Sequence, residues 1–169
     1  MTQSQTSHVP AGKHAVTPYL VTKGVTRLLE FIAAAFDADV YLRVPNADGT
    51  VGHAEARIGD SVIMAFDAKP HWIDTPSFVC LYVADVDATY ARALAAGAVS
   101  VTGLATSKVI GDRGARVRDP LGNIWWLQTH LEDVTPDEMA RRFGDPAELT
   151  AMRQAQDSFE AEMNRRSAR

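Results

Sequence analysis

The sequence contains one cysteine, Cys80, among 169 residues. A single cysteine cannot form an internal disulfide, which is typical of proteins in a reducing compartment. No apolar run approaches the roughly 20 residues that a membrane-spanning helix needs. Residues 1–14 are polar and lack the apolar region of a signal peptide. We therefore expect a cytoplasmic protein with no membrane segment.

The chain also lacks an excess of positive charge. It has 17 Lys and Arg against 21 Asp and Glu, which gives a formal net charge of −4. Nucleic acids select basic surfaces, so this balance argues against a nucleic-acid partner. The apolar fraction of 46% and the charged fraction of 22% are ordinary values for a globular protein. The length is sufficient for one domain with a sizeable core.

Two segments of the chain follow the same plan of a strand and then a helix. The first is 17–36, where periodicity predicts a helix with an apolar stripe. The second is 78–97, where Asp85 is the candidate N-cap and Gly97 ends the helix. The expected stripes are Val25, Leu28, Leu29, Ile32 and Phe36 in the first helix, and Val86, Tyr90 and Leu94 in the second.

Three strand-like runs follow each predicted helix. They lie near 39–44, 51–58 and 61–67 in the first half, and near 99–104, 114–118 and 123–130 in the second. Turn residues separate them, including Gly59-Asp60 and the Asp119-Pro120-Leu121-Gly122-Asn123 run. The pattern predicts an α+β fold built from two tandem βαβββ modules, at 15–67 and 77–134.

The ends of the chain follow a different pattern. Residues 1–14 are expected to be mobile. Residues 135–169 predict a C-terminal helical extension, because Thr135-Pro136-Asp137-Glu138 combines an N-cap, a Pro at the first helical position and a capping-box Glu, and Asp145-Pro146 repeats the signal. An apolar stripe on the second helix predicts packing on its own domain or on a partner. That stripe is Leu149, Met152, Phe159 and Met163.

Several motifs resemble one known family. They are the 111–113 run GDR, the 119–123 turn DPLGN with the aromatic strand behind it, TPYL at 17–20, GHAE at 52–55 and DVD at 85–87. Together they resemble the vicinal-oxygen-chelate superfamily of glyoxalases, bleomycin-resistance proteins and extradiol dioxygenases, in its PhnB-like branch. The resemblance covers about residues 16–134. It implies that the two modules of a 15–134 domain form an open barrel or cleft that binds a small organic molecule, and that the protein is a homodimer.

The resemblance also implies four metal-ligand positions, which fall on Thr17, Met64, Phe78 and Trp126. None of these side chains is a good ligand for a divalent metal, which prefers imidazole, carboxylate or thiolate. We therefore expect no metal and no cofactor. A displaced site built from His53 and Glu55, with His130 approaching, is an alternative. So is a simple His53–Glu55 hydrogen bond in the barrel wall.

Strand alternation sorts the side chains onto two faces. With Gly59-Asp60 as a two-residue turn, Glu55 opposes Met64, and both share a face with His53. The other face is small and apolar and should lie under a helix. The same parity in the second module places Arg116 and Trp126 on the face away from its helix. The residues predicted to bind substrate are Tyr19, Arg57, Met64, Phe66, Phe78, Tyr82, Trp126, Gln128 and His130. We expect His53, Glu55 and Trp126 to line one cavity.

Three functions fit these residues. The one we favour is a metal-independent enzyme that carries out isomerisation, elimination or cyclisation on a small organic substrate. Its catalytic residues would be His53 as acid or base, Glu55 as a base whose pKa burial raises, and Arg116 holding an anionic group or an enolate. The alternatives are a non-catalytic protein that sequesters an antibiotic or metabolite, and a glyoxalase-like enzyme with relocated metal ligands. The sequence does not identify the ligand.

Overall fold

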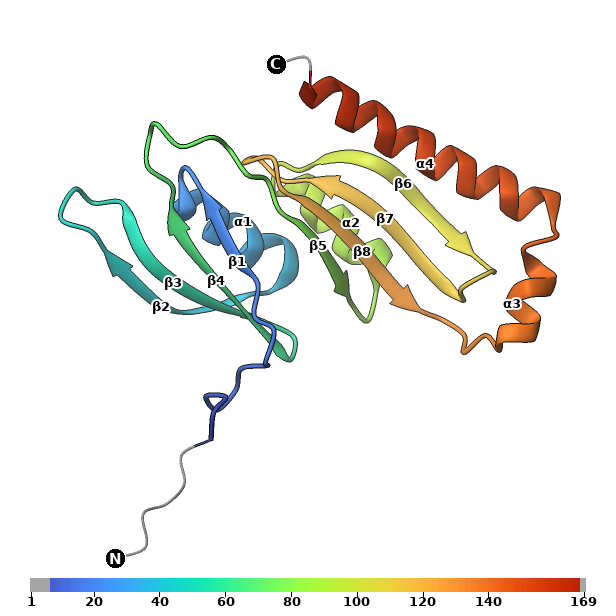
Figure 1. Ribbon diagram of the computed structural model, residues 1–169, viewed down its shortest axis with the longest axis horizontal. Helices are drawn as coiled ribbons and strands as arrows, with labels where there is room; N and C mark the ends of the chain where they lie inside the picture. Colours follow the sequence, from blue (N-terminus) through green and yellow to red (C-terminus); the bar gives the residue numbers. More distant parts are fainter. Residues whose placement is uncertain (1–6, 168–169) are drawn as a thin grey trace, which may run out of the picture. The chain divides into compact units, whose positions relative to one another are not determined.

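A computed structural model describes residues 7–167, apart from the side chain of Ser167 (Figure 1). The chain divides into two compact units, up to Pro76 and from Ser77. The first contains β1 (Tyr19–Thr22), α1 (Val25–Phe36), β2 (Asp39–Pro45), β3 (Val51–Ile58) and β4 (Ser61–Asp67). The second contains β5 (Phe78–Tyr82), α2 (Val86–Ala95), β6 (Val99–Ser107), β7 (Asp112–Arg118), β8 (Ile124–His130), α3 (Pro136–Arg142) and α4 (Pro146–Ser167).

Each unit is a βαβββ module, as predicted. The strand orders are β1-β4-β3-β2 and β5-β8-β7-β6, so each sheet is open and four-stranded. In both units the first strand pairs with the fourth in parallel, and the other pairs are antiparallel. The α+β class is confirmed. No helix among the described residues is long and apolar enough to cross a membrane.

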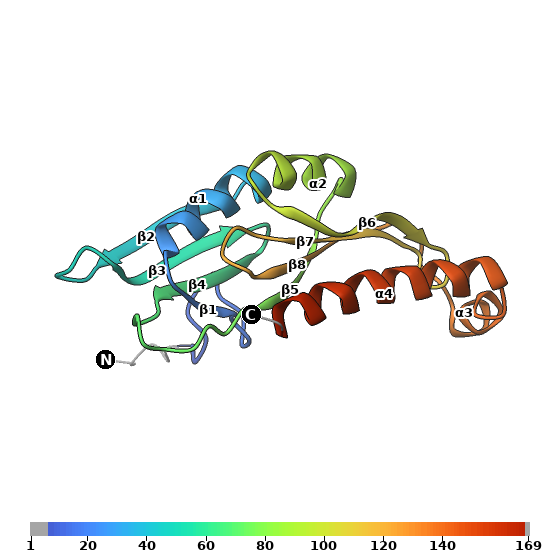
Figure 2. The same ribbon diagram turned by 90° about the horizontal axis from the view of Figure 1, so that it is seen from above.

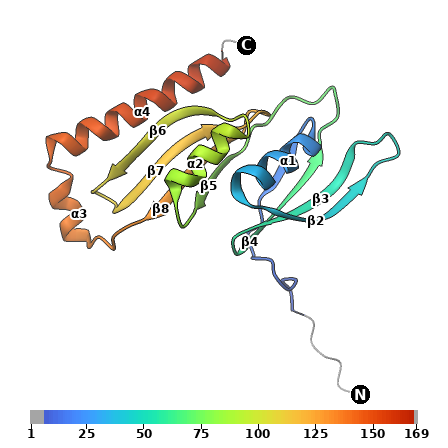
Figure 3. The same ribbon diagram turned by 180° about the vertical axis from the view of Figure 1, so that it is seen from behind.

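The first sheet has the register that the Gly59-Asp60 turn predicts. Glu55 pairs with Met64, and Ile58 pairs with Ser61. One face carries small apolar side chains that are buried under α1, which lies across this sheet in Figure 3. They are Ala54, Ala56, Ile58, Ile63 and Ala65. All five residues of the predicted α1 stripe are buried. The other face is therefore the one that carries His53 and Glu55.

Helix α2 begins as predicted, with the Asp85 side chain accepting a hydrogen bond from the Ala88 N–H at 3.0 Å. Its predicted apolar stripe is wrong in part. Val86 is buried, but Leu94 is 37% exposed, and Thr89 and Ala93 are buried instead. The buried face of α2 therefore carries the smaller side chains of Thr89 and Ala93 in place of Leu94.

The closing turn of the second unit is organised by Asp119, which is 1% exposed. Its carboxylate accepts hydrogen bonds from the backbone N–H of Leu121 and of Asn123, at 2.8 and 2.9 Å. It also accepts from the Asn123 side chain at 2.8 Å and from the Trp125 indole at 3.1 Å. Asp119 therefore ties the turn to Trp125, the largest side chain of the core.

Helices α3 and α4 form the C-terminal extension, and both begin at the predicted residues. The hydroxyl oxygen of Thr135 accepts a hydrogen bond from the Glu138 N–H at 3.3 Å. Figure 2 shows α4 on the opposite side of the second sheet from α2. The face of α4 toward the sheet carries Glu148, Met152, Ala155, Phe159 and Glu162. Helix α4 thus covers the face that sequence parity assigned to ligand binding.

The apolar stripe predicted for α4 is only partly on the packing face. Phe159 packs as predicted, with its ring 5.5 Å from that of Phe78. Met152 also faces the sheet and lines the cavity there, although it is 39% exposed. Leu149 and Met163 are not buried as predicted, since each is 43% exposed. The surface that receives the helix carries arginine and threonine side chains, so acidic residues such as Glu162 share the packing face with Met152 and Phe159.

The predicted mobility of 1–14 falls partly on residues 1–6, which lie outside the described residues. Within 7–14, a turn closes with a 3.1 Å hydrogen bond from the Lys13 N–H to the Pro10 carbonyl oxygen. Lys13 also reaches β3 and contacts Glu55. This part of the segment is therefore connected to the first sheet.

Gly111 of the GDR motif closes the loop between β6 and β7, with a left-handed φ of 74°. Its carbonyl oxygen accepts from the Leu131 and Glu132 N–H groups at 2.8 and 3.1 Å. A Cβ here would collide with the Glu132 carbonyl oxygen, whereas one at Gly49 (φ 84°) would meet nothing. We expect Gly111→Ala to lower the free energy of unfolding by about 2–4 kcal/mol and Gly49→Ala by about 1–2 kcal/mol. Urea denaturation measures both, and equal losses would contradict the close approach.

Candidate functional site

The first unit holds a hydrogen-bonded chain of polar side chains on the face opposite α1. The Tyr19 hydroxyl lies 2.9 Å from His53 Nδ1, and His53 Nε2 lies 3.1 Å from Glu55 Oε1. Lys13 Nζ donates to the same carboxylate oxygen at 2.6 Å, and the Tyr41 hydroxyl donates to Oε2 at 2.5 Å. Glu55, 7% exposed, is the centre of the chain.

The pKa of Glu55 is opposite in direction to the sequence prediction. Hydrogen bonds from Lys13, then from Tyr41, lower the pKa of Glu55 to about 2, although burial alone would raise it. Both carboxylate oxygens are engaged, and the group is a stable anion at neutral pH. A proton acceptor works best with a pKa near the working pH, so Glu55 is a poor general base in this arrangement.

Sequence reasoning missed two members of this chain. Tyr41 lies at a β-bulge, between the Val40–Ala56 and Leu42–Glu55 pairs. A bulge re-aims a side chain in a way that alternation does not predict. Lys13 precedes the first strand in an irregular segment, where no periodicity indicates a partner. One feature of the sequence could have indicated both residues. A buried Glu55 carboxylate needs hydrogen-bond donors, and its own hairpin supplies too few of them.

Around this chain lie the other predicted residues of the first module. The Tyr19 and Phe66 rings are 5.3 Å apart, edge to face. Met64 pairs with both Tyr19 and Glu55 in the sheet. The Arg57 guanidinium lies 5.6 Å from the centre of the Tyr41 ring. The first sheet thus gathers its predicted site residues on one face.

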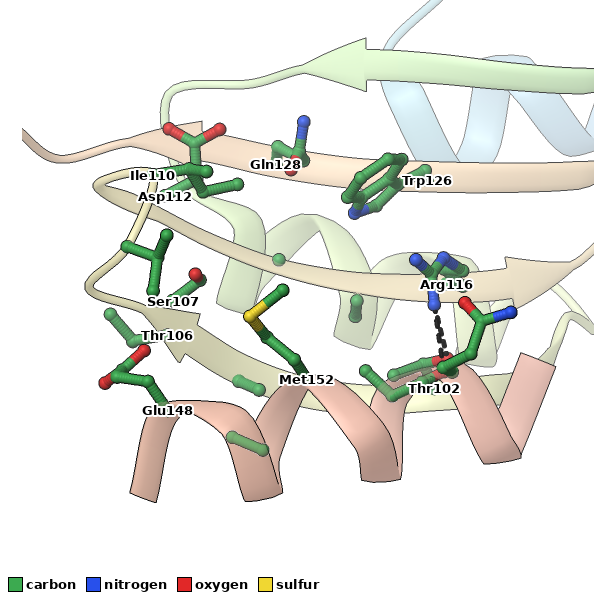
Figure 4. Close-up of a pocket in the computed structure, with 17 residues that line it drawn as sticks. Thr102, Thr106, Ser107, Ile110, Asp112, Arg116, Trp126, Gln128, Glu148 and Met152 are labelled. Carbon is green, nitrogen blue, oxygen red and sulfur yellow. Dashed lines mark hydrogen bonds between the residues drawn. The ribbon is translucent and has the colours of Figure 1, made fainter. Parts of the chain in front are cut away.

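The second unit contains a cavity of about 340 Å³ between β6–β8 and α4 (Figure 4). Much of its wall is apolar, from Ala105, Val109, Ile110, Ala115, Ala151, Met152, Ala155 and the Trp126 ring. The polar wall includes Thr102, Asp112, Arg116, Gln128, Glu148 and Gln156. Such a mixture, mainly apolar with a few placed polar groups, is typical of a small-molecule pocket.

Arg116 lies between the sheet and α4. Its guanidinium carbon is 4.7 Å from the centre of the Trp126 ring and 5.3 Å from that of Phe159. Its Nη1 donates to the Ala155 carbonyl oxygen at 3.1 Å and to the Thr102 hydroxyl at 3.3 Å. Burial lowers the pKa of Arg116. The side chain connects the predicted ligand-binding face to the C-terminal helix.

Asp112 lies near the other end of the cavity, with Glu148 (Figure 4). The Asp112 carboxylate accepts from the Tyr82 hydroxyl at 3.0 Å and lies 2.7 Å from His130 Nδ1. His130 Nε2 lies 3.0 Å from Asp133. Hydrogen bonding to Asp112, then to Asp133, raises the pKa of His130, and the bond to Asp112 raises the pKa of Tyr82. The carboxylate therefore favours a protonated His130 beside it.

The second module brings together six predicted residues. Arg116, Trp126 and Gln128 line the cavity, while Tyr82 and His130 share Asp112. Phe78 packs on Phe159 of α4. The α4 residues of the cavity wall were missed, because no strand pattern indicates which helix covers a sheet face. His53 and Glu55 belong to the first unit and Trp126 to the second. That the three line one cavity stays a prediction.

Residues 13–127 match the model of the Glyoxalase/Bleomycin resistance protein/Dioxygenase superfamily. The chain belongs to this superfamily. An uncharacterised protein of Mycobacterium bovis is 37% identical to it over 136 residues, which cover 74% of this chain and 89% of the relative. The segment that matches the superfamily model ends within β8, so α3 and α4 lie outside that segment.

Solved structures of the superfamily share the fold. TioX from Micromonospora sp. ML1 matches with a TM-score of 0.59 and 29% identity, covering 70% of this chain and 99% of TioX. A PhnB protein from Bacillus cereus matches with a TM-score of 0.54 and 19% identity, covering 69% of this chain and 99% of that protein. The predicted superfamily is confirmed, and the PhnB protein shares its fold. Membership supports a protein that binds a small molecule.

The superfamily's metal positions do not suit a metal in this chain. Thr17 donates its hydroxyl to the His14 carbonyl oxygen at 3.0 Å, and the Trp126 ring is stacked against Arg116. Met64 and Phe78 supply a thioether and a hydrocarbon ring. The displaced set fits no better, because Lys13 and Tyr41 occupy both oxygens of Glu55. Over residues 7–167 there is no group of three or more His, Cys, Asp or Glu side chains that could hold a metal ion.

Proposed function

We propose that this superfamily member binds a small organic molecule in the cavity beneath α4 and sequesters it without converting it. The observation that carries this proposal is the cavity itself, in which the Trp126 ring and the wall supplied by α4 enclose about 340 Å³. That volume lies at the lower end of the range of about 300–1,000 Å³ for small-ligand pockets. The ligand would lie over Trp126 and contact Met152 and Gln128.

The state of Glu55 supports binding over turnover. The favoured enzyme mechanism needed this carboxylate as a base, yet Lys13 and Tyr41 hold it as an anion with a pKa of about 2. In the cavity, Asp112 is similarly engaged by Tyr82 and His130. The low pKa of Glu55 therefore disfavours its use as a base, and the Asp112 carboxylate already has two partners within the fold.

Metal-independent acid/base chemistry is the second candidate, and one observation favours it. The Tyr19 hydroxyl and both nitrogens of His53 form a continuous hydrogen-bonded chain to Glu55. In such a chain Glu55 would orient His53, and the Tyr19 hydroxyl would meet the substrate. Isomerisation, elimination and cyclisation all remain compatible with this chain. The homodimer and the cytoplasmic location also stay predictions.

Native mass spectrometry tests the proposal. We expect the purified protein to retain a small molecule, or to bind the uncharged aromatic probe phenylnaphthylamine at one site per chain. Trp126→Ala should weaken binding at least about tenfold, a loss of about 1.4 kcal/mol. The matched control is Trp72→Ala, in the first unit, which should leave binding unchanged.

Two results would contradict the proposal. One is the absence of any bound molecule or probe, and the other is binding that Trp126→Ala leaves intact. Release of the retained molecule with a changed composition after incubation would instead favour the acid/base enzyme. The mass of the released molecule therefore separates the two candidates.

A further inference from the structure

We infer that the ligand of the α4 cavity carries an anionic group, which lies at the Arg116 end. This inference rests on the proposed function and specifies the chemical class of the ligand. It comes from a comparison of the three charged side chains that line the cavity, Asp112, Glu148 and Arg116.

The two carboxylates of the cavity have compensating partners within the fold. Asp112 lies against His130, whose pKa it raises, and also accepts from Tyr82. Glu148 lies in the first turn of α4, where the helix dipole favours a negative charge, and accepts from the Lys108 N–H at 3.0 Å. These charges are stabilised without a ligand.

Arg116 is compensated by uncharged groups only, since its guanidinium lies against the Trp126 and Phe159 rings. Among the described residues no carboxylate lies within 4.0 Å of its guanidinium, which bonds only to a carbonyl oxygen and a hydroxyl. Its Nε is buried without a hydrogen-bond partner. A partly buried cation that faces a cavity of low polarity interacts strongly with an anion placed there. The ligand is therefore the missing counter-charge.

The layout of the cavity orients this ligand. In Figure 4, Arg116 and Trp126 lie toward one end, and Asp112 and Glu148 toward the other. An anionic group near the carboxylates would be repelled, while one near Arg116 is attracted. The apolar wall of Met152 then receives the body of the molecule. The expected ligand is an aromatic or apolar molecule with a carboxylate, sulfonate or similar group at one end.

A matched pair of fluorescent probes tests the inference. Anilinonaphthalene sulfonate and phenylnaphthylamine share one aromatic skeleton and differ by the sulfonate. We expect the full-length protein to bind the sulfonate about tenfold more tightly. Arg116→Met should abolish that preference while retaining phenylnaphthylamine binding. The control Arg153→Met changes an exposed arginine of α4 that does not line the cavity, and should keep the preference.

The outcomes separate this inference from the proposed function. Equal binding of the two probes, or a preference that survives Arg116→Met, overturns the anionic ligand and leaves the cavity as a binding site. Failure of both probes to bind the unmodified protein overturns the proposed function and this inference with it. If Arg116→Met binds neither probe, Arg116→Lys decides: a retained preference supports the inference, and a lost one overturns it.

Discussion

Replacing Glu55 with glutamine is expected to lower the free energy of unfolding by about 1–2 kcal/mol at neutral pH, because solvent screens part of the interaction with its partly exposed partners. The pKa of Glu55 is lowered from 4.5 to about 2, chiefly by the hydrogen bond from Lys13, so the fold favours its anion. The neutral amide would leave the Lys13 ammonium without its counter-charge. Glu55 itself is 7% exposed, so water reaches its side chain poorly, whereas Lys13 and Tyr41 are more accessible and can be rehydrated.

The effect should depend on pH in a definite direction. A lowered folded-state pKa gives stability that is present above about 4.5 and is lost as the pH falls through about 2. Urea denaturation at a series of pH values should therefore show the difference between the wild-type protein and Glu55→Gln narrowing over this window. The control Glu30→Gln changes an exposed carboxylate of α1 and should shift stability by less than about 0.5 kcal/mol. Parallel pH curves for wild type and Glu55→Gln would contradict the network.

Truncation after Val134 should weaken probe binding by at least about tenfold and lower the melting temperature by about 4–10 °C. Without α4 the cavity loses one wall, and Phe78 loses its contact with Phe159. The truncation also removes the buried Glu162, so Arg118 loses the ion pair that joins them at 3.0 Å. Calorimetry and fluorescence titration measure the two effects separately.

The full-length variant Leu149→Ser is the control for this truncation. Leu149 is 43% exposed, so its replacement should leave both readouts nearly unchanged. If Leu149→Ser matched the truncation, the apolar stripe would be the packing surface after all. Unchanged probe binding by the truncated chain would remove α4 from the ligand site.

The parts of the fold set by alternation and turns could be predicted from the sequence. The Gly59-Asp60 turn fixes the pairing of Glu55 with Met64, because a shift of one residue would bury the charge beneath α1. The Asp85 cap and the start of α4 at Pro146 follow from local chemistry in the same way. In each case neighbouring residues carry enough information to determine the structure.

The rest depends on contacts between residues distant in the sequence. The partners of Glu55 come from a bulge at Tyr41 and an irregular segment at Lys13, so the direction of its pKa shift could not be inferred from its own strand. Helix α4 is held on the sheet by a hydrogen bond from Arg116 to the Ala155 carbonyl oxygen and by the ion pair between Arg118 and Glu162. The hydropathy pattern placed Leu149 on that face, because such a pattern takes no account of hydrogen bonds and ion pairs between the helix and the sheet.

Because α4 lies beyond the superfamily segment yet forms a cavity wall, the pocket has two separable sources of selectivity. The sheet supplies Arg116 and Trp126, and a helix attached through a single connection supplies Met152. Grafting a different C-terminal helix after Val134 would therefore change the shape of the pocket while leaving the strand register intact. The connection after β8 is a natural junction for building chimaeras with altered ligand range.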